Sequence, residues 1–154
     1  MLSCLVGRLP INRCAIAEAG VGLLTWSRVS SVGVRAMDQQ HGVLMDTLND
    51  LRQAAAQGAR ERAVKEFGRV AEFARQHFLS EERLLEQMGF PALDEHRESH
   101  ARLMEKMQIA LERSQHGQNG EMQAAAAAVR VWLAEHIEQL DQNYGEWLNE
   151  RGIL

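Results

Sequence analysis

The stretch Val70-Ala-Glu-Phe-Ala-Arg-Gln-His77-Phe-Leu-Ser-Glu81-Glu-Arg-Leu-Leu-Glu-Gln-Met88 decides the fold, because one set of its residues recurs every three or four positions. That spacing places them on one face of an α-helix, which must be buried against other elements. The members of this stripe are Val70, Phe73, His77, Glu81, Leu84 and Met88. A histidine and a carboxylate on a buried face need partners, since burying an unpaired polar group is costly. The stretch therefore predicts a helix that carries polar side chains into a core.

Working outward, three further segments show the helical period, and breakers separate all four. Gly58 ends the first segment, Gly89-Phe-Pro91 the second, and a turn over Gly117–Gly120 the third. The predicted helices cover about residues 36–56, 59–88, 92–115 and 121–149. Short turns between long amphipathic helices imply antiparallel neighbours. The predicted fold is all-α, an antiparallel up-down-up-down four-helix bundle.

The chain before the first helix has no helical period. Residues 1–22 are expected to form a loose N-terminal extension, and an irregular arm follows up to Val34, with Trp26 as its expected anchor. A length of 154 residues suits one domain. We therefore expect an N-terminal extension over 1–22 and a single four-helix domain over 23–154.

Composition excludes several classes of protein. The hydrophobic content of 45% and charged content of 25% are ordinary for a globular chain, which argues against disorder. A net charge of −4 gives no basic footprint for nucleic acid, and no run reaches the length of a membrane span. Arg8 and Pro10 interrupt the only candidate for a signal peptide. Cys4 and Cys14 lie outside the helical segments, so we favour neither a disulfide nor a thiolate site, and expect a cytoplasmic protein without nucleic-acid or membrane partners.

Five of the six histidines belong to the helical stripes, in spaced pairs with one another or with carboxylates. Residues four apart on a helix differ by only about 40° in direction and about 6 Å in height, so the pairs His77/Glu81 and His96/His100 each project together. Any one of these histidines alone would more often be a satisfied core or surface residue. Together they predict a two-metal site whose candidate ligands are His41, His77, Glu81, His96, His100, His136 and Asp141.

Asp141 is the member that does not fit a regular helix. It follows His136 by five residues, a step that turns about 140° around the axis. Either the fourth helix widens to a π-turn between these two residues, or Asp141 is not a ligand.

The donor set predicts the kind of metal and leaves one coordination position open. Five imidazoles, two bridging carboxylates and one bridging solvent oxygen fall one short of the positions on two octahedral ions. Octahedral coordination and bridging carboxylates suit iron or manganese better than zinc, which prefers four tetrahedral ligands. Only two of the candidate ligands are anionic. So few negative charges stabilise high oxidation states of the metals weakly, which favours reversible binding of dioxygen over its cleavage.

Five stretches of the chain resemble the hemerythrin family, in order and over about residues 24–150. They are Val32-Gly-Val34 through Asp38-Gln-Gln-His41, His77-Phe-Leu-Ser-Glu81-Glu82, Gly89-Phe-Pro91, His96-Arg-Glu-Ser-His100, and Trp132-Leu-Ala-Glu-His136-Ile137-Glu-Gln-Leu-Asp141. Phe90 departs from the family, which commonly has tyrosine there, and residues 1–22 have no counterpart.

The resemblance implies a role for each candidate. His96, His100 and His136 would ligate a coordinatively saturated iron, and His41 and His77 the iron with the vacancy. Glu81 and Asp141 would bridge the two iron ions together with an oxo or hydroxo group. The walls of the dioxygen pocket would be Phe78, Trp132, Leu133, Ile137 and Leu44, with Tyr144 nearby.

Other readings remain open beside reversible dioxygen binding. The same ferrous pair could reduce peroxide or nitric oxide as an enzyme, or act as an oxygen or redox sensor through a partner. An electron-transfer or oxygen-accepting partner would be unidentified in each case. A zinc protease is disfavoured, because Arg97 stands in His96-Arg-Glu-Ser-His100 where the general base would be glutamate. His116 lies in a turn and receives no role.

Overall fold

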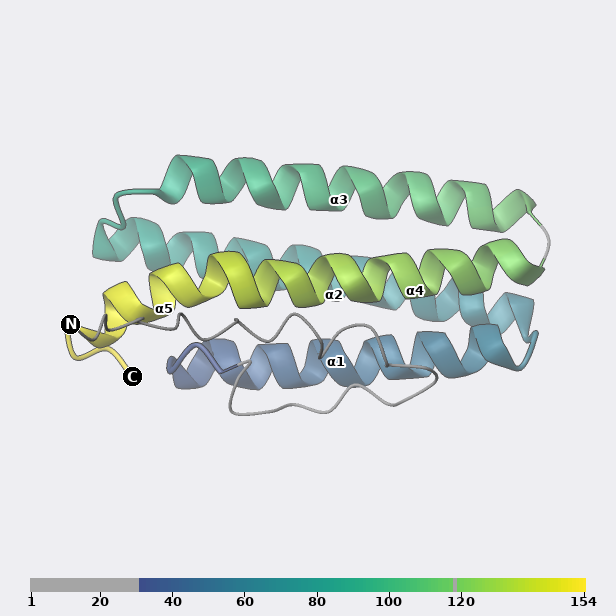
Figure 1. The fold of residues 1–154 in the computed structure, drawn as a ribbon, viewed down its shortest axis with the longest axis horizontal. Helices are drawn as coiled ribbons and strands as arrows, with labels where there is room; N and C mark the ends of the chain where they lie inside the picture. The colour runs from purple at the N-terminus through teal and green to yellow at the C-terminus, as the bar shows by residue number, and fades with distance from the viewer. Residues whose placement is uncertain (1–30, 118) are drawn as a thin grey trace, which may run out of the picture.

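Four long helices form the body of the protein in the computed structural model, which describes residues 31–117 and 119–154. The elements are α1 (Arg35–Ala56), α2 (Arg60–Met88), α3 (Leu93–His116), α4 (Asn119–His136), the π-helical turn η1 (Ile137–Asp141) and α5 (Gln142–Asn149). Because α4, η1 and α5 follow one another without a break, they form the fourth long rod (Figure 1). α1 packs on α2 and α4, and α3 packs on α2 and α4, which closes the bundle. The predicted all-α four-helix bundle is confirmed.

The helix ends follow the predicted breakers closely. Gly89 takes the left-handed conformation, φ 73°, that ends α2, and its backbone N–H bonds to the carbonyl of Glu86. Gly58 likewise has φ 65° after α1. The third turn is shorter than predicted, because α4 already begins at Asn119. The guanidinium of Arg60 donates to the carbonyls of Ser114, Gln115 and Gly117, so a residue of α2 caps the end of α3.

Two apolar clusters fill the bundle, one on either side of a polar layer. The larger cluster includes Leu44, Phe78, Leu103 and Leu133, and the smaller one includes Met37, Leu85, Tyr144 and Leu148. In α1 the buried His41 falls between Met37 and Leu44, and in α2 Glu81 falls between Phe78 and Leu85. In α3 and in the fourth rod the buried predicted ligands likewise fall between residues of the two clusters. The predicted ligands therefore lie in one layer between two dry clusters.

Two residues that the stripes place inward are exposed. Met88 is 38% exposed, because α2 ends there and Gly89 turns the chain away. The helical period of the third predicted helix allows either Ile109 or Leu111 as its next inward residue after Met107. Ile109 is 42% exposed, while Leu111 packs half-buried against the larger cluster, so Leu111 is the inward one. The inward stripe of α3 instead continues through Met107 to Ser114.

The described end of the N-terminal arm is fixed to the bundle. The Ser31 hydroxyl and the Val32 amide both donate to the carboxylate of Asp38, over 2.6 and 2.8 Å. The Asn149 amide donates to the Val32 carbonyl over 3.0 Å. A Cβ atom on Gly145 would lie 2.4 Å from that carbonyl oxygen, so only glycine admits the arm here. Trp26, the expected anchor, lies outside the described residues.

No helix within the described residues combines the length and apolar composition that a bilayer span requires.

Candidate metal centre

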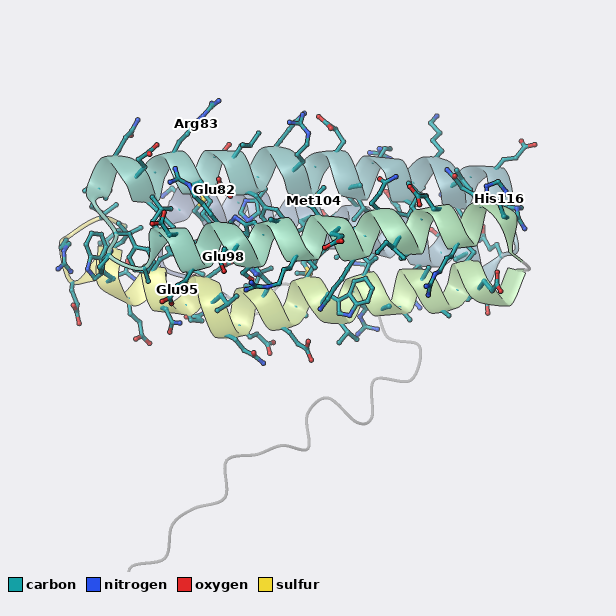
Figure 2. All side chains as sticks on the ribbon, turned by 90° about the horizontal axis from the view of Figure 1, so that it is seen from above. Glu82, Arg83, Glu95, Glu98, Met104 and His116 are labelled. Atoms are coloured by element: carbon teal, nitrogen blue, oxygen red, sulfur yellow. The ribbon has the colours of Figure 1, made fainter. Side chains whose placement is uncertain are left out.

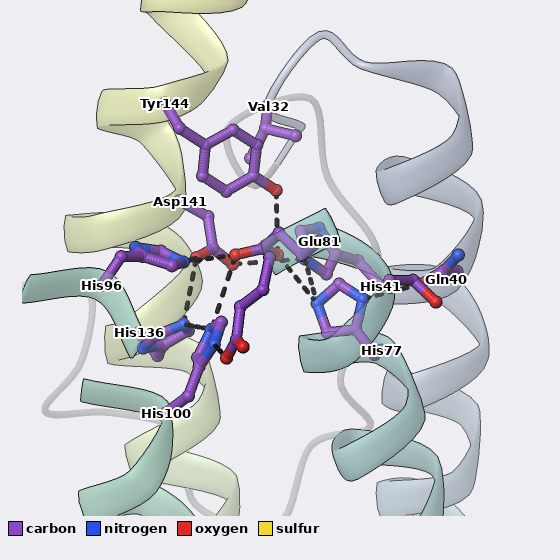
Figure 3. Close-up of polar contacts among 12 residues, drawn as sticks. Val32, Gln40, His41, His77, Glu81, His96, His100, His136, Asp141 and Tyr144 are labelled. Atoms are coloured by element: carbon purple, nitrogen blue, oxygen red, sulfur yellow. Dashed lines mark hydrogen bonds and ion pairs between the residues drawn. The ribbon is translucent and has the colours of Figure 1, made fainter. Parts of the chain in front are cut away.

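All seven predicted ligands converge on one buried site inside the bundle (Figure 3). Their exposed fractions do not exceed 5%, and the side chains of His41, Glu81 and Asp141 are completely buried. α1 supplies His41, α2 supplies His77 and Glu81, and the α4 rod supplies His136 and Asp141. His96 and His100 come from α3, so every rod contributes to the layer.

The fourth rod contains a π-turn, the first of the two alternatives that the spacing of His136 and Asp141 left open. Residues Ile137–Asp141 form a π-helical turn, which accommodates the five-residue step from His136. The Asp141 carboxylate consequently lies 3.0 Å from His136 Nε2 and 3.2 Å from His41 Nε2. A regular helix would have turned this carboxylate away, so the π-turn is what joins Asp141 to the layer.

The donor atoms fall into two groups that share both carboxylates. One group contains His96, His100 and His136, and the other contains His41 and His77. Glu81 and Asp141 belong to both, and within each group the donor atoms lie within 4.8 Å of one another. This is the pattern of two neighbouring cations bridged by carboxylates.

Several imidazole nitrogens face one another rather than a proton donor. The Nε2 atoms of His41 and His77 lie 3.0 Å apart, and so do those of His100 and His136. Both oxygens of Asp141 are buried and accept no hydrogen bond of acceptable geometry, although imidazole nitrogens surround them. Buried acceptors that crowd together without donors are costly unless a cation lies among them.

The outer ring nitrogens explain why the inner ones present lone pairs. His100 Nδ1 lies 2.7 Å from Glu82 Oε1, and since a carboxylate only accepts, the proton belongs on this Nδ1. His77 Nδ1 lies 2.9 Å from Gln40 Oε1, which assigns its proton in the same way. In a neutral imidazole the inward Nε2 is then unprotonated and able to ligate a metal. The donor set therefore fits a pair of cations.

At both carboxylates and at His77, the electrostatics of the layer favour the protonation states that metal ligation needs. Burial would raise the pKa of Asp141, but contacts with His136 and His41 hold it well below its usual range. Burial and the Asp141 charge would also raise the pKa of Glu81, but contacts with the imidazoles of His100 and His96 outweigh them and lower it. Burial lowers the pKa of His77 to about 4. The two carboxylates are thus ionised and His77 is neutral at neutral pH.

Tyr144 reaches the layer from the side of the smaller apolar cluster. Its hydroxyl donates to Glu81 Oε2 over 3.1 Å, and its side chain is completely buried. Burial first, then the charge of Glu81, raise the pKa of this phenol well above its usual value, so it remains a donor. Tyr144 therefore holds Glu81, one of the two carboxylates that the donor groups share.

The opposite side of the layer is apolar. The Phe78 ring stacks on the His100 ring with centroids 3.9 Å apart, and lies 5.4 Å from the His136 ring. Leu44, Leu133 and Ile137 belong to the same cluster and are at most 2% exposed. Trp132 differs from them, since it is half-buried at the edge of this cluster with the Lys106 ammonium above its ring.

Three polar residues that the sequence analysis did not predict contact the outer ring nitrogens of the histidines. They are Gln40, Glu82 and Ser99. Gln40 immediately precedes His41, Glu82 follows Glu81, and Ser99, whose hydroxyl lies 3.3 Å from His136 Nδ1, precedes His100. A search for polar residues adjacent in sequence to each predicted ligand would have found all three. His116, given no role, is exposed at the far end of α3 (Figure 2).

Comparison with known proteins agrees with this geometry. The family of the hemerythrin HHE cation binding domain matches residues 32–148. A bacteriohemerythrin of Methylococcus capsulatus is 29% identical over 131 residues, which cover 84% of this chain and 99% of that protein. A bacteriohemerythrin of Stenotrophomonas maltophilia is 28% identical over 126 residues, 82% of each chain.

The solved structures agree in the fold as well as in the sequence. The crystal structure of a wild-type hemerythrin superposes with a TM-score of 0.73 at 27% identity, and the match covers 81% of this chain and 97% of that one. The matched span contains all seven side chains of the layer, from His41 to Asp141. The chain belongs to the hemerythrin family.

Proposed function

We propose that the protein binds dioxygen reversibly at a pair of iron ions held in the polar layer. The observation that carries this proposal is the division of seven buried donors into two groups with Glu81 and Asp141 in common. Storage, delivery or buffering of dioxygen needs no further chemistry.

The division leaves the two metal positions with unequal numbers of protein donors. His96, His100 and His136 with the two shared carboxylates give five donors, whereas His41 and His77 with the same carboxylates give four. A bridging oxo or hydroxo group would complete the first position and leave the second one short. The proposed dioxygen site is therefore on the side of His41 and His77.

Iron is the proposed metal because of the donor types. Imidazole and bridging carboxylate together suit iron, and the membership in the hemerythrin family supports the same choice. When bound, the iron pair supplies the electrons that reversible dioxygen binding requires. Two carboxylates and five imidazoles, which are uncharged when they ligate a metal, would form a weakly anionic set, and such a set favours binding over cleavage of dioxygen.

The residues around the layer keep water from the pair in this proposal. The apolar wall consists of Phe78, Leu133, Ile137 and Leu44, and Trp132 lies at its outer edge. Water and anions would promote irreversible oxidation of a ferrous pair, so a dry wall extends the lifetime of the oxygenated protein. We propose the cytoplasm as the location of the protein. An electron-transfer or oxygen-accepting partner would complete this function.

An optical cycle tests the function. The anaerobically reduced, iron-loaded protein is exposed to air and then deoxygenated, with absorption spectra and dioxygen uptake recorded at each stage. We expect uptake of one dioxygen per iron pair with a visible band that disappears on deoxygenation. Rapid irreversible oxidation, with turnover when a reductant and either peroxide or nitric oxide are added, would replace the proposal by an enzyme. A protein that retains only zinc and does not respond to oxygen would refute both.

A further inference from the structure

A groove of about 1020 Å³ runs between α3 and α4, beyond the metal centre and toward the end of the bundle marked by His116 (Figure 2). One stripe of each helix lines it. Ile109 and Ala110 come from α3, and Ala124, Ala125 and Ala128 come from α4. Trp132 closes the end nearer the metal centre. None of the seven predicted metal ligands lines this groove, and Trp132, at the outer edge of the apolar wall, borders both.

The groove exists because small side chains face one another along it. Alanine ends at Cβ, so the run of alanines on α4 opposite Ala110 leaves the space between the two helices unfilled. The floor is nonetheless apolar: Ala125 is 9% exposed, and Ala110 and Ala128 are half-buried. An apolar hollow of this kind favours an apolar occupant, whose burial displaces water from the floor.

The rim of the groove is basic, although the chain as a whole carries a net charge of −4. Lys106, Arg113 and His116 line it from α3, and Glu121 is the acidic residue among the lining. Within the described residues, Arg113 and Lys106 form no ion pair, and Lys106 lies 5.6 Å above the Trp132 ring. A guanidinium without a carboxylate partner beside an apolar floor is complementary to a molecule with an acidic head and an apolar tail.

We propose that this groove binds a free medium-chain fatty acid. The carboxylate contacts the guanidinium of Arg113, and the hydrocarbon chain follows the alanine floor toward Trp132. Trp132 follows Ala124 by eight positions, a rise of about 12 Å along α4, which is suited to a chain of medium length. The stem of Lys106 covers the distal end of the chain from the α3 side. The site is separate from dioxygen binding and does not depend on that function.

Calorimetric titration of the full-length, iron-loaded protein with decanoate, below its micelle-forming concentration, tests the proposal. We expect one decanoate per chain with a dissociation constant of roughly 10–100 μM. Arg113→Gln removes the contact for the head and should weaken binding by about tenfold or more. Arg83→Gln is its matched control, because Arg83 is exposed on α2 and its loss changes the net charge equally. This variant should bind decanoate as the unmodified protein does.

The apolar half of the proposal has its own pair of variants. Ala128→Leu fills the floor and should weaken binding by about tenfold or more, whereas Ala127→Leu, at an exposed position outside the lining, should not. 1-Decanol, which has the same tail without the charge, should bind more weakly than decanoate, and this difference should vanish in Arg113→Gln. Circular dichroism confirms that each variant is folded. Absence of decanoate binding up to millimolar concentration, or equal binding to Arg113→Gln, Ala128→Leu and their controls, would overturn the proposal.

Discussion

The hydroxyl of Tyr144 donates to Glu81 Oε2, so one of the two carboxylates shared by both donor groups is held from the side opposite the apolar wall. His96 holds the other oxygen of the same carboxylate. Side chains of the protein thus contact both oxygens of Glu81, which suits a ligand that would bridge two ions.

Glu81 should matter more for metal content than a ligand that belongs to one group alone. Because Glu81 contributes to both donor groups and His41 to one, Glu81→Ala should retain fewer iron ions per chain than His41→Ala. Metal analysis of the purified variants measures this. His116→Ala, at the exposed end of α3, is the control and should keep the unmodified content. Full iron content in Glu81→Ala would remove the bridging role.

The contact between Glu82 and His100 should tune the metal affinity. Glu82→Gln replaces a carboxylate acceptor with an amide, which holds the proton of His100 Nδ1 less firmly and makes Nε2 a poorer donor. Loss of such an outer contact typically weakens metal binding by roughly 10–100-fold. Competition with a chelator measures the affinity. Glu98→Gln makes the same charge change at an exposed position of α3, and a loss as large in this variant would show that net charge alone is responsible.

Leu133 should protect the proposed iron pair from water. Leu133→Gln places an amide in a wall that is otherwise apolar, so we expect faster irreversible oxidation of the air-exposed protein with unchanged iron content. The decay of the oxygenated absorption band over time provides the rate. Val131→Gln is the control, because Val131 is 44% exposed two residues away. Equal rates in Leu133→Gln and the unmodified protein would exclude the wall as the barrier.

The metal-free protein should lose stability as the pH falls from about 6.5 to about 4. The folded state lowers the pKa of His77 from 6.5 to about 4, so in this range the unfolded chain binds more protons and acid favours unfolding. That shift corresponds to about 3 kcal/mol once the pH is below 4. The lowered pKa values of Glu81 and Asp141 act in the same direction at lower pH. The raised pKa of His96 opposes this trend. It stabilises the folded protein fully below pH 6.5, and this stabilisation is lost as the pH rises through the raised pKa.

Urea denaturation of the metal-free protein at a series of pH values tests this dependence. His77→Gln removes one titrating group and should flatten the loss of stability between pH 6.5 and 4. A variant with the same slope as the unmodified protein would show that His77 titrates normally in the fold.

The sequence predicted the bundle and the seven converging side chains because both depend on helical spacing. His77 and Glu81, four residues apart, project together on any helix, whatever surrounds it. The position of Asp141 could not be decided, since a π-turn depends on what the neighbouring helices and the site require rather than on local propensity. The contacts of Gln40 and Glu82 depend on side-chain rotamers set by packing. The exposure of Met88 follows from where α2 ends relative to its neighbours, which periodicity does not determine.

Anomalous diffraction at the iron absorption edge, from crystals of the iron-loaded protein, tests the central claim most directly. The account predicts two iron peaks in the polar layer, one bordered by His96, His100 and His136 and the other by His41 and His77. Glu81 and Asp141 should lie between the two peaks and contact both. A single peak, or a pair of peaks from which Asp141 points away, would contradict the account.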